Sequence, residues 1–336
     1  MEKKNQHQNK ILGILVSAVF ILLIFWKIDL HQLFATFKGF DFRAFLIFVP
    51  VYLLGIYIRG ARWKYLLCND KKLSVNEAFF SFTAGNTLNS YLPARAGDFW
   101  RAVHVGNKIG ESKMKLLGSI ILERIIDGIS VLLILYTAIL LYFKHQKVIE
   151  IAIFSAVLFF GAFIFFFVLF KTGKITDIFE WLKKLPFLNK NHEIIDKLSG
   201  LSELFMNGFS VLNDPKCFWG AFLMSMIAWM LECFVTYVLI SGFGLGIGFS
   251  SALFVISFVA LSTVIPSSSV FIGPYQFAYI LALGIYHVSK SQALAVAFVH
   301  QIIIMILITI ITVIYFACVN TSMKEISEEI KSGEEN

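Results

Sequence analysis

The chain has 336 residues, of which 58% are hydrophobic and 15% charged, and its mean hydropathy is +0.76. A soluble domain carries about 25% charged residues, so this composition excludes an ordinary soluble globular protein. The formal net charge of +7 does not indicate nucleic-acid binding, because Lys and Arg collect in the cytoplasmic loops of membrane proteins.

Six apolar runs are long enough to span a bilayer and predict an all-α polytopic membrane protein. The first follows a polar N-terminus without a cleavage site, so we expect an uncleaved helix. The four cysteines form no CxxC pair, and we expect neither a disulfide framework nor a metal site. The runs are residues 11–28, 44–67, 116–143, 149–170, 217–241 and 293–318.

Two further regions, residues 75–109 and 249–288, are hydrophobic but broken. The first divides at Pro93 and the second at Pro266. Each region is therefore expected to form a re-entrant hairpin that enters and leaves by one face. Counting the pieces separately would give about eight spans by hydropathy.

A shift of 173 residues (266 minus 93) relates two halves of the chain, residues 44–143 and 217–318. Each half reads as helix, broken hairpin, helix. Because an odd number of crossings separates the halves, they are predicted to form an inverted repeat, as in many transporters. We expect one membrane domain, residues 1–320, with an inner loop over 171–216 and a polar tail over 321–336.

The distribution of the 29 Lys and Arg residues indicates the orientation. The positive-inside rule then places both termini in the cytoplasm of a multi-pass plasma-membrane protein. Few of these residues fall on the outer side: Lys27, Lys38, Arg43, Lys144, Lys147 and Lys290.

The first broken region contains the sequence NTLNSYLPARAGDFWR, which is too polar to face lipid. Arg offers a planar fork that suits phosphate, so a lipid-binding role is one interpretation. The alternative is a structural pairing of both arginines with Asp98, if the helix begins at residue 95. The candidate ligands are Asn86, Asn89, Arg95, Asp98 and Arg101, and Pro93 and Gly97 are expected to shape the backbone.

Five of the six arginines lie between residues 59 and 124. Arg59 and Arg62 are either anchors at the inner interface or parts of a site. Glu123, Arg124 and Asp127 lie close together on a predicted span, where charged groups are expected to point inward. They form either an ion-pair lock, for which Arg95 or Arg101 is the expected partner, or a set of ligands.

The second half offers fewer charges. Glu232 stands alone in its span, and the 173-residue shift maps it to Arg59, as it maps His300 to Asp127. An acid at this depth could take a proton or balance a cationic headgroup. The second break provides either a polar lining or a tight turn, through Pro266, Ser267, Gly273, Pro274 and Tyr275.

No nucleophile motif, P-loop or metal-spaced cluster occurs in the sequence. We therefore expect no catalytic residues, no metal and no cofactor. A membrane enzyme remains an alternative, with its base from Asp98 or from the Glu123/Asp127 pair, and so does a scaffold without transport.

Three motifs resemble the lysylphosphatidylglycerol synthase transmembrane region, or flippase-like domain, family. They are Arg59-x-x-Arg62-Trp63, then Asn86-x-x-Asn89-x-x-x-Pro93-x-Arg95-x-Gly97-Asp98-x-x-Arg101, then Glu123-Arg124-x-x-Asp127. The resemblance covers roughly residues 10–320, with Asp98 where Glu is more usual in the family.

The resemblance implies a translocase that moves an anionic or aminoacylated phospholipid between leaflets. The implied partners are membrane phospholipids, with a homo-oligomer or a lipid-modifying enzyme as further possibilities and no nucleic acid. The chain ends at Asn336, so we expect the aminoacyltransferase domain of the two-part members to be absent. The alternative is an enzyme or accessory subunit acting on lipid headgroups or lipid-linked sugars.

Overall fold

The computed structural model describes residues 36–67, 72–92, 95–142, 146–173, 192–263 and 273–319, and every regular element in this part is a helix. It confirms the prediction of an all-α polytopic membrane protein. In chain order the elements are α3 Ala44–Leu66, α4 Val75–Tyr91, α5 Ala96–Ile109, α6 Lys113–Tyr142, α7 Gln146–Thr172, α9 His192–Met206, the 3-10 helix η2 Asn207–Asn213, α10 Pro215–Gly242, α11 Ser250–Ser262, α12 Pro274–Gly284 and α13 Lys290–Val319.

Five of the predicted spans correspond to long helices. Among the described residues, α3, α10 and α13 are long and apolar enough to cross a membrane, with 23, 28 and 30 residues. Helices α6 and α7 are as long, with 30 and 27 residues, but α6 carries the charged cluster at its centre. The predicted first span, residues 11–28, lies outside the described residues.

The order of one long helix, two short helices and one long helix occurs twice along the chain. Adding 173 to the residue numbers carries α3 onto α10, α4 onto α11, α5 onto α12 and α6 onto α13, with ends that differ by a few residues. The two short helices of each half pack on one another as a hairpin. Pro93 and Pro266 fall between them, outside the described residues.

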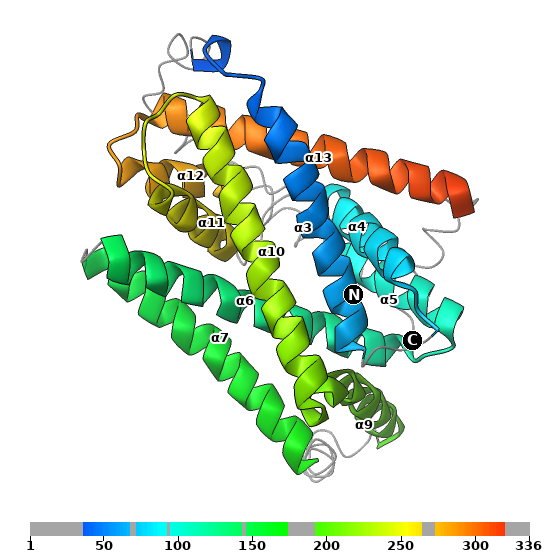
Figure 1. Ribbon diagram of the computed structural model, residues 1–336. Helices are drawn as coiled ribbons and strands as arrows, with labels where there is room; N and C mark the ends of the chain where they lie inside the picture. The colour runs from blue at the N-terminus through cyan, green and yellow to red at the C-terminus, as the bar shows by residue number, and fades with distance from the viewer. Residues whose placement is uncertain are drawn as a thin grey trace.

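The two halves run in opposite directions, because α3 and α10 cross in antiparallel fashion (Figure 1). Beside the start of α3, the Asp41 N–H donates to the Gly242 carbonyl at the end of α10, 2.9 Å away. At the other end, Tyr65 lies against Gly220. The inverted repeat predicted from the 173-residue shift is thereby confirmed, whereas its orientation in the membrane stays a prediction.

Each hairpin packs on the last helix of the opposite half, α4 on α13 and α11 on α6. Figure 1 shows the α4–α5 hairpin on one side of the α3–α10 pair and the α11–α12 hairpin on the other. On the first side, the Thr87 hydroxyl lies 2.8 Å from that of Thr312 and donates to the Ile308 carbonyl over 3.1 Å. The exchange of hairpins joins the halves into one body.

Local sequence signals explain several helix ends. The Ser74 hydroxyl accepts from the Glu77 N–H and starts α4. At α10, Pro215 occupies the first turn and the Asp214 carboxyl accepts from the N–H groups of Cys217 and Lys216, which lower its pKa. Helix α12 begins at Gly273, whose φ of 106° favours glycine, followed by Pro274.

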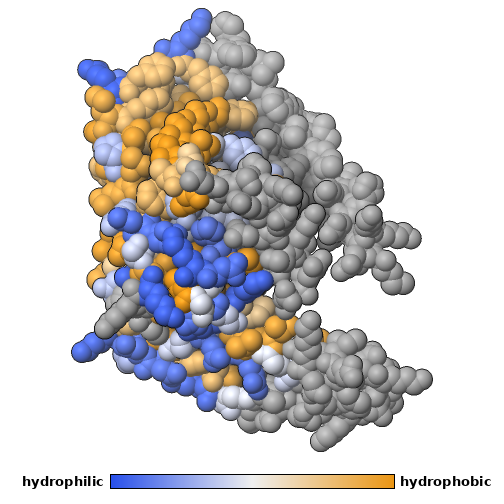
Figure 2. Space-filling view, turned by 90° about the vertical axis from the view of Figure 1, so that its right-hand side faces the viewer, coloured by the Kyte–Doolittle hydropathy of each residue, from blue (hydrophilic) through white to orange (hydrophobic). Residues whose placement is uncertain are grey.

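The surface separates by polarity on the side shown in Figure 2. Hydrophilic residues gather at the open end of the α4–α5 hairpin, and a hydrophobic surface lies above them. This separation suits a hairpin whose open end meets lipid headgroups or water. The exposed polar residues at this end include Lys72, Ser74, Asn76, Asn107 and Lys108.

The α4–α5 hairpin closes by direct contact of its backbones. A Cβ atom at Gly97 would overlap the Gly85 carbonyl oxygen and would lie 2.8 Å from the Asn89 nitrogen. A side chain at residue 97 therefore requires the two helices to separate.

We expect Gly97→Ala to destabilise the protein by about 1–3 kcal/mol, the usual cost of overpacking. The control is Gly161→Ala in α7, where the added methyl meets nothing within 4 Å. Thermal unfolding in detergent should show a lower midpoint for the first variant alone. Equal midpoints would contradict the close packing of α4 on α5.

The inverted repeat predicts that positions related by the 173-residue shift lie on opposite sides of the membrane. The open ends of the two hairpins provide such positions. Asn76→Cys and Gly248→Cys, each in a cysteine-free background, lie within one residue of such matched positions. Because Lys-rich ends face the cytoplasm, we expect a membrane-impermeant thiol reagent added to intact cells to label residue 248 and not residue 76. Labelling of both from outside would contradict this topology.

Candidate functional site

A cavity of about 370 Å³ lies between the crossed α3–α10 pair and the two hairpins. This volume falls within the range of small-molecule sites, about 300–1,000 Å³. Helices α6, α7 and α13 complete its walls. Most of the ligand residues predicted from the sequence line it: Arg59, Asn86, Asn89, Arg95, Arg124, Asp127, Glu232 and Tyr275.

The other predicted residues lie elsewhere. Asp98, Arg101 and Glu123 are buried and do not line the cavity. Gly97 forms the α4–α5 contact, and Gly273 and Pro274 begin α12. Ser267, Pro93 and Pro266 lie outside the described residues.

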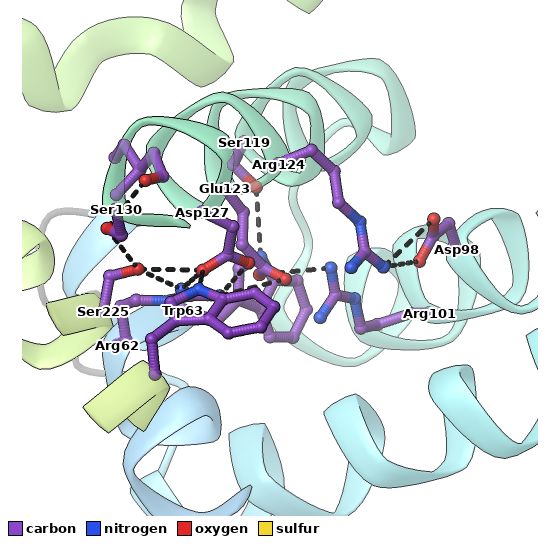
Figure 3. A network of polar contacts seen from close by, with 12 residues as sticks. Arg62, Trp63, Asp98, Arg101, Ser119, Glu123, Arg124, Asp127, Ser130 and Ser225 are labelled. Carbon is purple, nitrogen blue, oxygen red and sulfur yellow. Dashed lines mark hydrogen bonds and ion pairs between the residues drawn. The ribbon is translucent and has the colours of Figure 1, made fainter. Parts of the chain in front are cut away.

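A network of buried charges lies next to the cavity (Figure 3). At its centre is Arg62, whose side chain is fully buried. Its guanidinium contacts both oxygens of Asp127, one of them at 3.1 Å, and lies 3.3 Å from Glu123. Glu123 in turn lies 3.3 Å from Arg101. These ion pairs join α3, α5 and α6.

Asp127 is the best-satisfied acid of the site. Besides the two contacts with Arg62, its carboxylate accepts from the Ser225 hydroxyl and from the Trp229 indole N–H, both over 2.8 Å. Ser225 also accepts from Arg62 over 2.9 Å. Asp127 therefore joins α10 to the network. Because its carboxylate oxygens already accept several hydrogen bonds, few acceptor positions remain for a ligand.

The expected pairing of Asp98 with Arg95 and Arg101 requires a correction. Asp98 instead lies 3.2 Å from Arg124 and accepts from the Asn89 amide over 3.0 Å. The helical spacing does not apply because Arg95 precedes α5 in a left-handed conformation, with φ 54°. Arg101 turns toward Glu123, with its guanidinium 4.4 Å from the centre of the Trp63 ring.

Arg95 connects the tips of the two hairpins. Its guanidinium donates to the Thr263 carbonyl at the end of α11 over 3.3 Å. No ion pair to Arg95 occurs among the described residues. A left-handed conformation is uncommon for a residue with a side chain and often marks a functional position. A guanidinium on the cavity wall without a carboxylate partner is suited to an anion.

Arg59 and Glu232 mark the symmetry axis of the repeat. The 173-residue shift carries one onto the other, and their side chains lie 3.7 Å apart. Two equivalent positions that contact each other must lie beside the axis that relates them. Both side chains are largely buried, and Arg59 also lies 4.3 Å from the centre of the Trp229 ring. The cavity therefore surrounds the axis.

Helices α4 and α11, which the 173-residue shift relates, contribute unlike walls to this cavity. The 173-residue shift relates Thr83 to Ile256 and Asn86 to Val259, and all four residues line the cavity. The first half supplies polar and charged groups, while α11 supplies an aliphatic surface that Ala260 and Leu261 extend. Such an amphipathic cavity suits a ligand with a charged and an apolar part.

Sequence reasoning left the role of Arg62 open, because its position at the end of an apolar run resembles an interface anchor; the structure places it in the buried network. Trp229, Ser225 and Tyr279 received no assignment. Trp229 is the shift equivalent of Ile56, and both line the cavity, so the repeat itself was the signal that could have identified it.

We expect Glu123→Gln to lower the stability strongly, by about 3–5 kcal/mol, since Arg101 would lose its carboxylate inside the protein. The matched control is Glu111→Gln, a partly exposed acid that pairs with Lys115 one turn away. The fraction of protein that stays monodisperse after heating in detergent measures the effect. Similar curves for both variants would contradict a structural role for the network.

Comparison with known proteins places these features in a family. Residues 10–312 match the family model described as lysylphosphatidylglycerol synthase TM region. The chain is also similar to the UPF0104 membrane protein MJ1078 of Methanocaldococcus jannaschii, with 25% identity over 218 residues, which are 64% of this chain and 87% of the relative.

Proposed function

This chain belongs to the lysylphosphatidylglycerol synthase TM region family, and from that premise we propose that it moves an anionic or aminoacylated phospholipid between membrane leaflets. The observation that carries the proposal is the amphipathic cavity on the repeat axis, with arginines on one wall and aliphatic side chains on the other. The proposal places the protein in the plasma membrane with both termini in the cytoplasm.

Arg95 and Arg124 are the proposed phosphate ligands. Both line the cavity, Arg95 without an ion-pair partner among the described residues and Arg124 with about a third of its side chain exposed. The amides of Asn86 and Asn89 lie on the same wall. This set replaces the sequence-based choice of Arg101, which lies behind the wall on Glu123.

The aliphatic wall would receive the apolar part of the lipid. Ile256, Val259 and Leu261 of α11 face the cavity, and Ile304 and Ile308 of α13 add further aliphatic lining. A lipid held in this way keeps its charges on the first half and its chains on the second. Binding then requires no bare charge in the hydrocarbon region.

Movement across the membrane follows from the inverted repeat. In such folds a site near the midplane opens alternately to each side as the two halves rock against each other. The contact between Arg95 and Thr263 joins the hairpin tips, where the two halves would separate. No nucleotide-binding motif is present in the sequence, so movement would be passive, driven by a gradient or coupled to a partner.

Reconstituted vesicles with fluorescent phosphatidylglycerol in one leaflet test the proposal. We expect Arg95→Lys and Arg124→Lys to slow lipid movement roughly tenfold or more. A charged hydrogen bond contributes about 1.5–3 kcal/mol, and each 1.4 kcal/mol is about tenfold. Arg43→Lys is the matched control, because Arg43 is exposed and pairs only locally with Asp41.

Product analysis in the same vesicles separates transport from chemistry. Unchanged lipid in the opposite leaflet supports a translocase. A modified headgroup would support the enzyme alternative. Full activity of both Lys variants would leave the two arginines without a role in binding.

A further inference from the structure

Glu232 differs from the other acids of the cavity because hydrogen bonds do not satisfy it. Its carboxylate makes two longer contacts, 3.7 Å to Arg59 and 3.8 Å to the His300 Nε2. Among the described residues no hydrogen bond reaches this carboxylate, whereas Asp127 accepts several. About a sixth of the Glu232 side chain is exposed, toward the cavity. Water or a ligand in the cavity can therefore reach it.

His300 offers this carboxylate a free lone pair. The imidazole is almost fully buried, and its Nδ1 contacts the hydroxyls of Tyr275, at 3.1 Å, and Tyr279. With the ring proton on Nδ1 and donated to a tyrosine oxygen, Nε2 is an acceptor. Nε2 has no hydrogen-bond partner among the described residues and faces Glu232. An un-ionised Glu232 could donate its proton there after a small side-chain rotation.

Arg59 is the permanent charge in contact with Glu232. If Glu232 takes up a proton, Arg59 keeps its charge on the cavity wall but loses its only ion pair among the described residues, while Asp127, the other acid near it, stays paired with Arg62. A buried charge without a partner is costly, so an anion in the cavity is then strongly favoured. The titratable groups that face Glu232 are Arg59 and Tyr52 from α3, Cys233 from α10, Tyr275 and Tyr279 from α12 and His300 from α13, with Asp127 of α6 beyond Trp229.

We propose that Glu232 is a proton-binding site, and that one proton and one lipid phosphate occupy the cavity together. The inference rests on the proposed function and adds its energy source. The Glu232 carboxylate accepts a proton from cavity water, and Arg59 exchanges this carboxylate for a phosphate oxygen. When the phosphate leaves, Glu232 returns the proton to water and pairs again with Arg59.

This exchange lets a proton gradient drive the lipid. A headgroup with one negative charge and one proton cross together, so the pair carries no net charge. By linkage, lipid binding must raise the proton affinity of Glu232, and a lower pH must tighten lipid binding to the same extent.

The experiment measures proton uptake when the purified full-length protein binds short-chain phosphatidylglycerol in a weakly buffered detergent solution. This phosphodiester stays ionised near neutral pH and takes up no proton itself. We expect about one proton per bound lipid, and an affinity that rises toward about tenfold per unit fall in pH where Glu232 is ionised in the free protein.

Three variants assign the proton. Glu232→Gln should bind phosphatidylglycerol without proton uptake and with an affinity independent of pH. Glu232→Asp keeps a titratable group and should keep the uptake. Glu111→Gln, the matched surface control, should behave as the wild type.

Two outcomes would overturn the inference alone: lipid binding by the wild type without proton uptake, or uptake that persists in Glu232→Gln. The number of protons taken up per lipid bound by the wild type decides the first outcome, even if a variant does not fold. Failure of the wild type to bind or move phosphatidylglycerol would overturn the proposed function, and this inference with it.

Discussion

The structure depends on one constraint: a charge inside an apolar bundle must find its partner within the protein. Arg62 is fully buried and lies between Asp127 and Glu123, which also contacts Arg101. Removing one member would leave an uncompensated charge, so the ion pairs fix the relative positions of the helices that carry them. Because Ser225 extends this network to α10, the first half is bound to the second by polar contacts as well as by apolar packing.

Internal symmetry places the cavity, and the loss of symmetry in the side chains gives it polarity. The antiparallel crossing of α3 and α10 brings Arg59 against its equivalent, Glu232. Around this point the first half retains Thr83 and Asn86, where the second half has Ile256 and Val259. A symmetric backbone can open the cavity to either side of the membrane. The polar and aliphatic walls of the cavity orient an amphipathic ligand in one way. Both properties fit the proposed movement of a phospholipid.

Much of the fold could be predicted because hydropathy and helix-breaking residues act locally. The 173-residue shift identified equivalent helices although residue identity between the halves is low. The partners of individual charges could be predicted only in part: Arg101 was one of two expected partners of the cluster at Glu123 and does contact Glu123. Asp98 was expected to pair within its own helix, yet Arg95 adopts a left-handed conformation and Asp98 turns to Arg124. Similarly, periodicity cannot reveal that Arg62 packs inward, since that depends on how α3 crosses α6 and α10.

The site therefore combines a fixed part and a variable part. Asp127 is held by the guanidinium of Arg62, by a hydroxyl and by an indole N–H, so exchanging its partners would cost several hydrogen bonds. Glu232 has only two long contacts, and one of its neighbours, His300, retains a free nitrogen. A switch requires two states that differ by a few kcal/mol. Only a loosely held acid such as Glu232 meets that requirement, while the rigid network preserves the shape of the cavity around it.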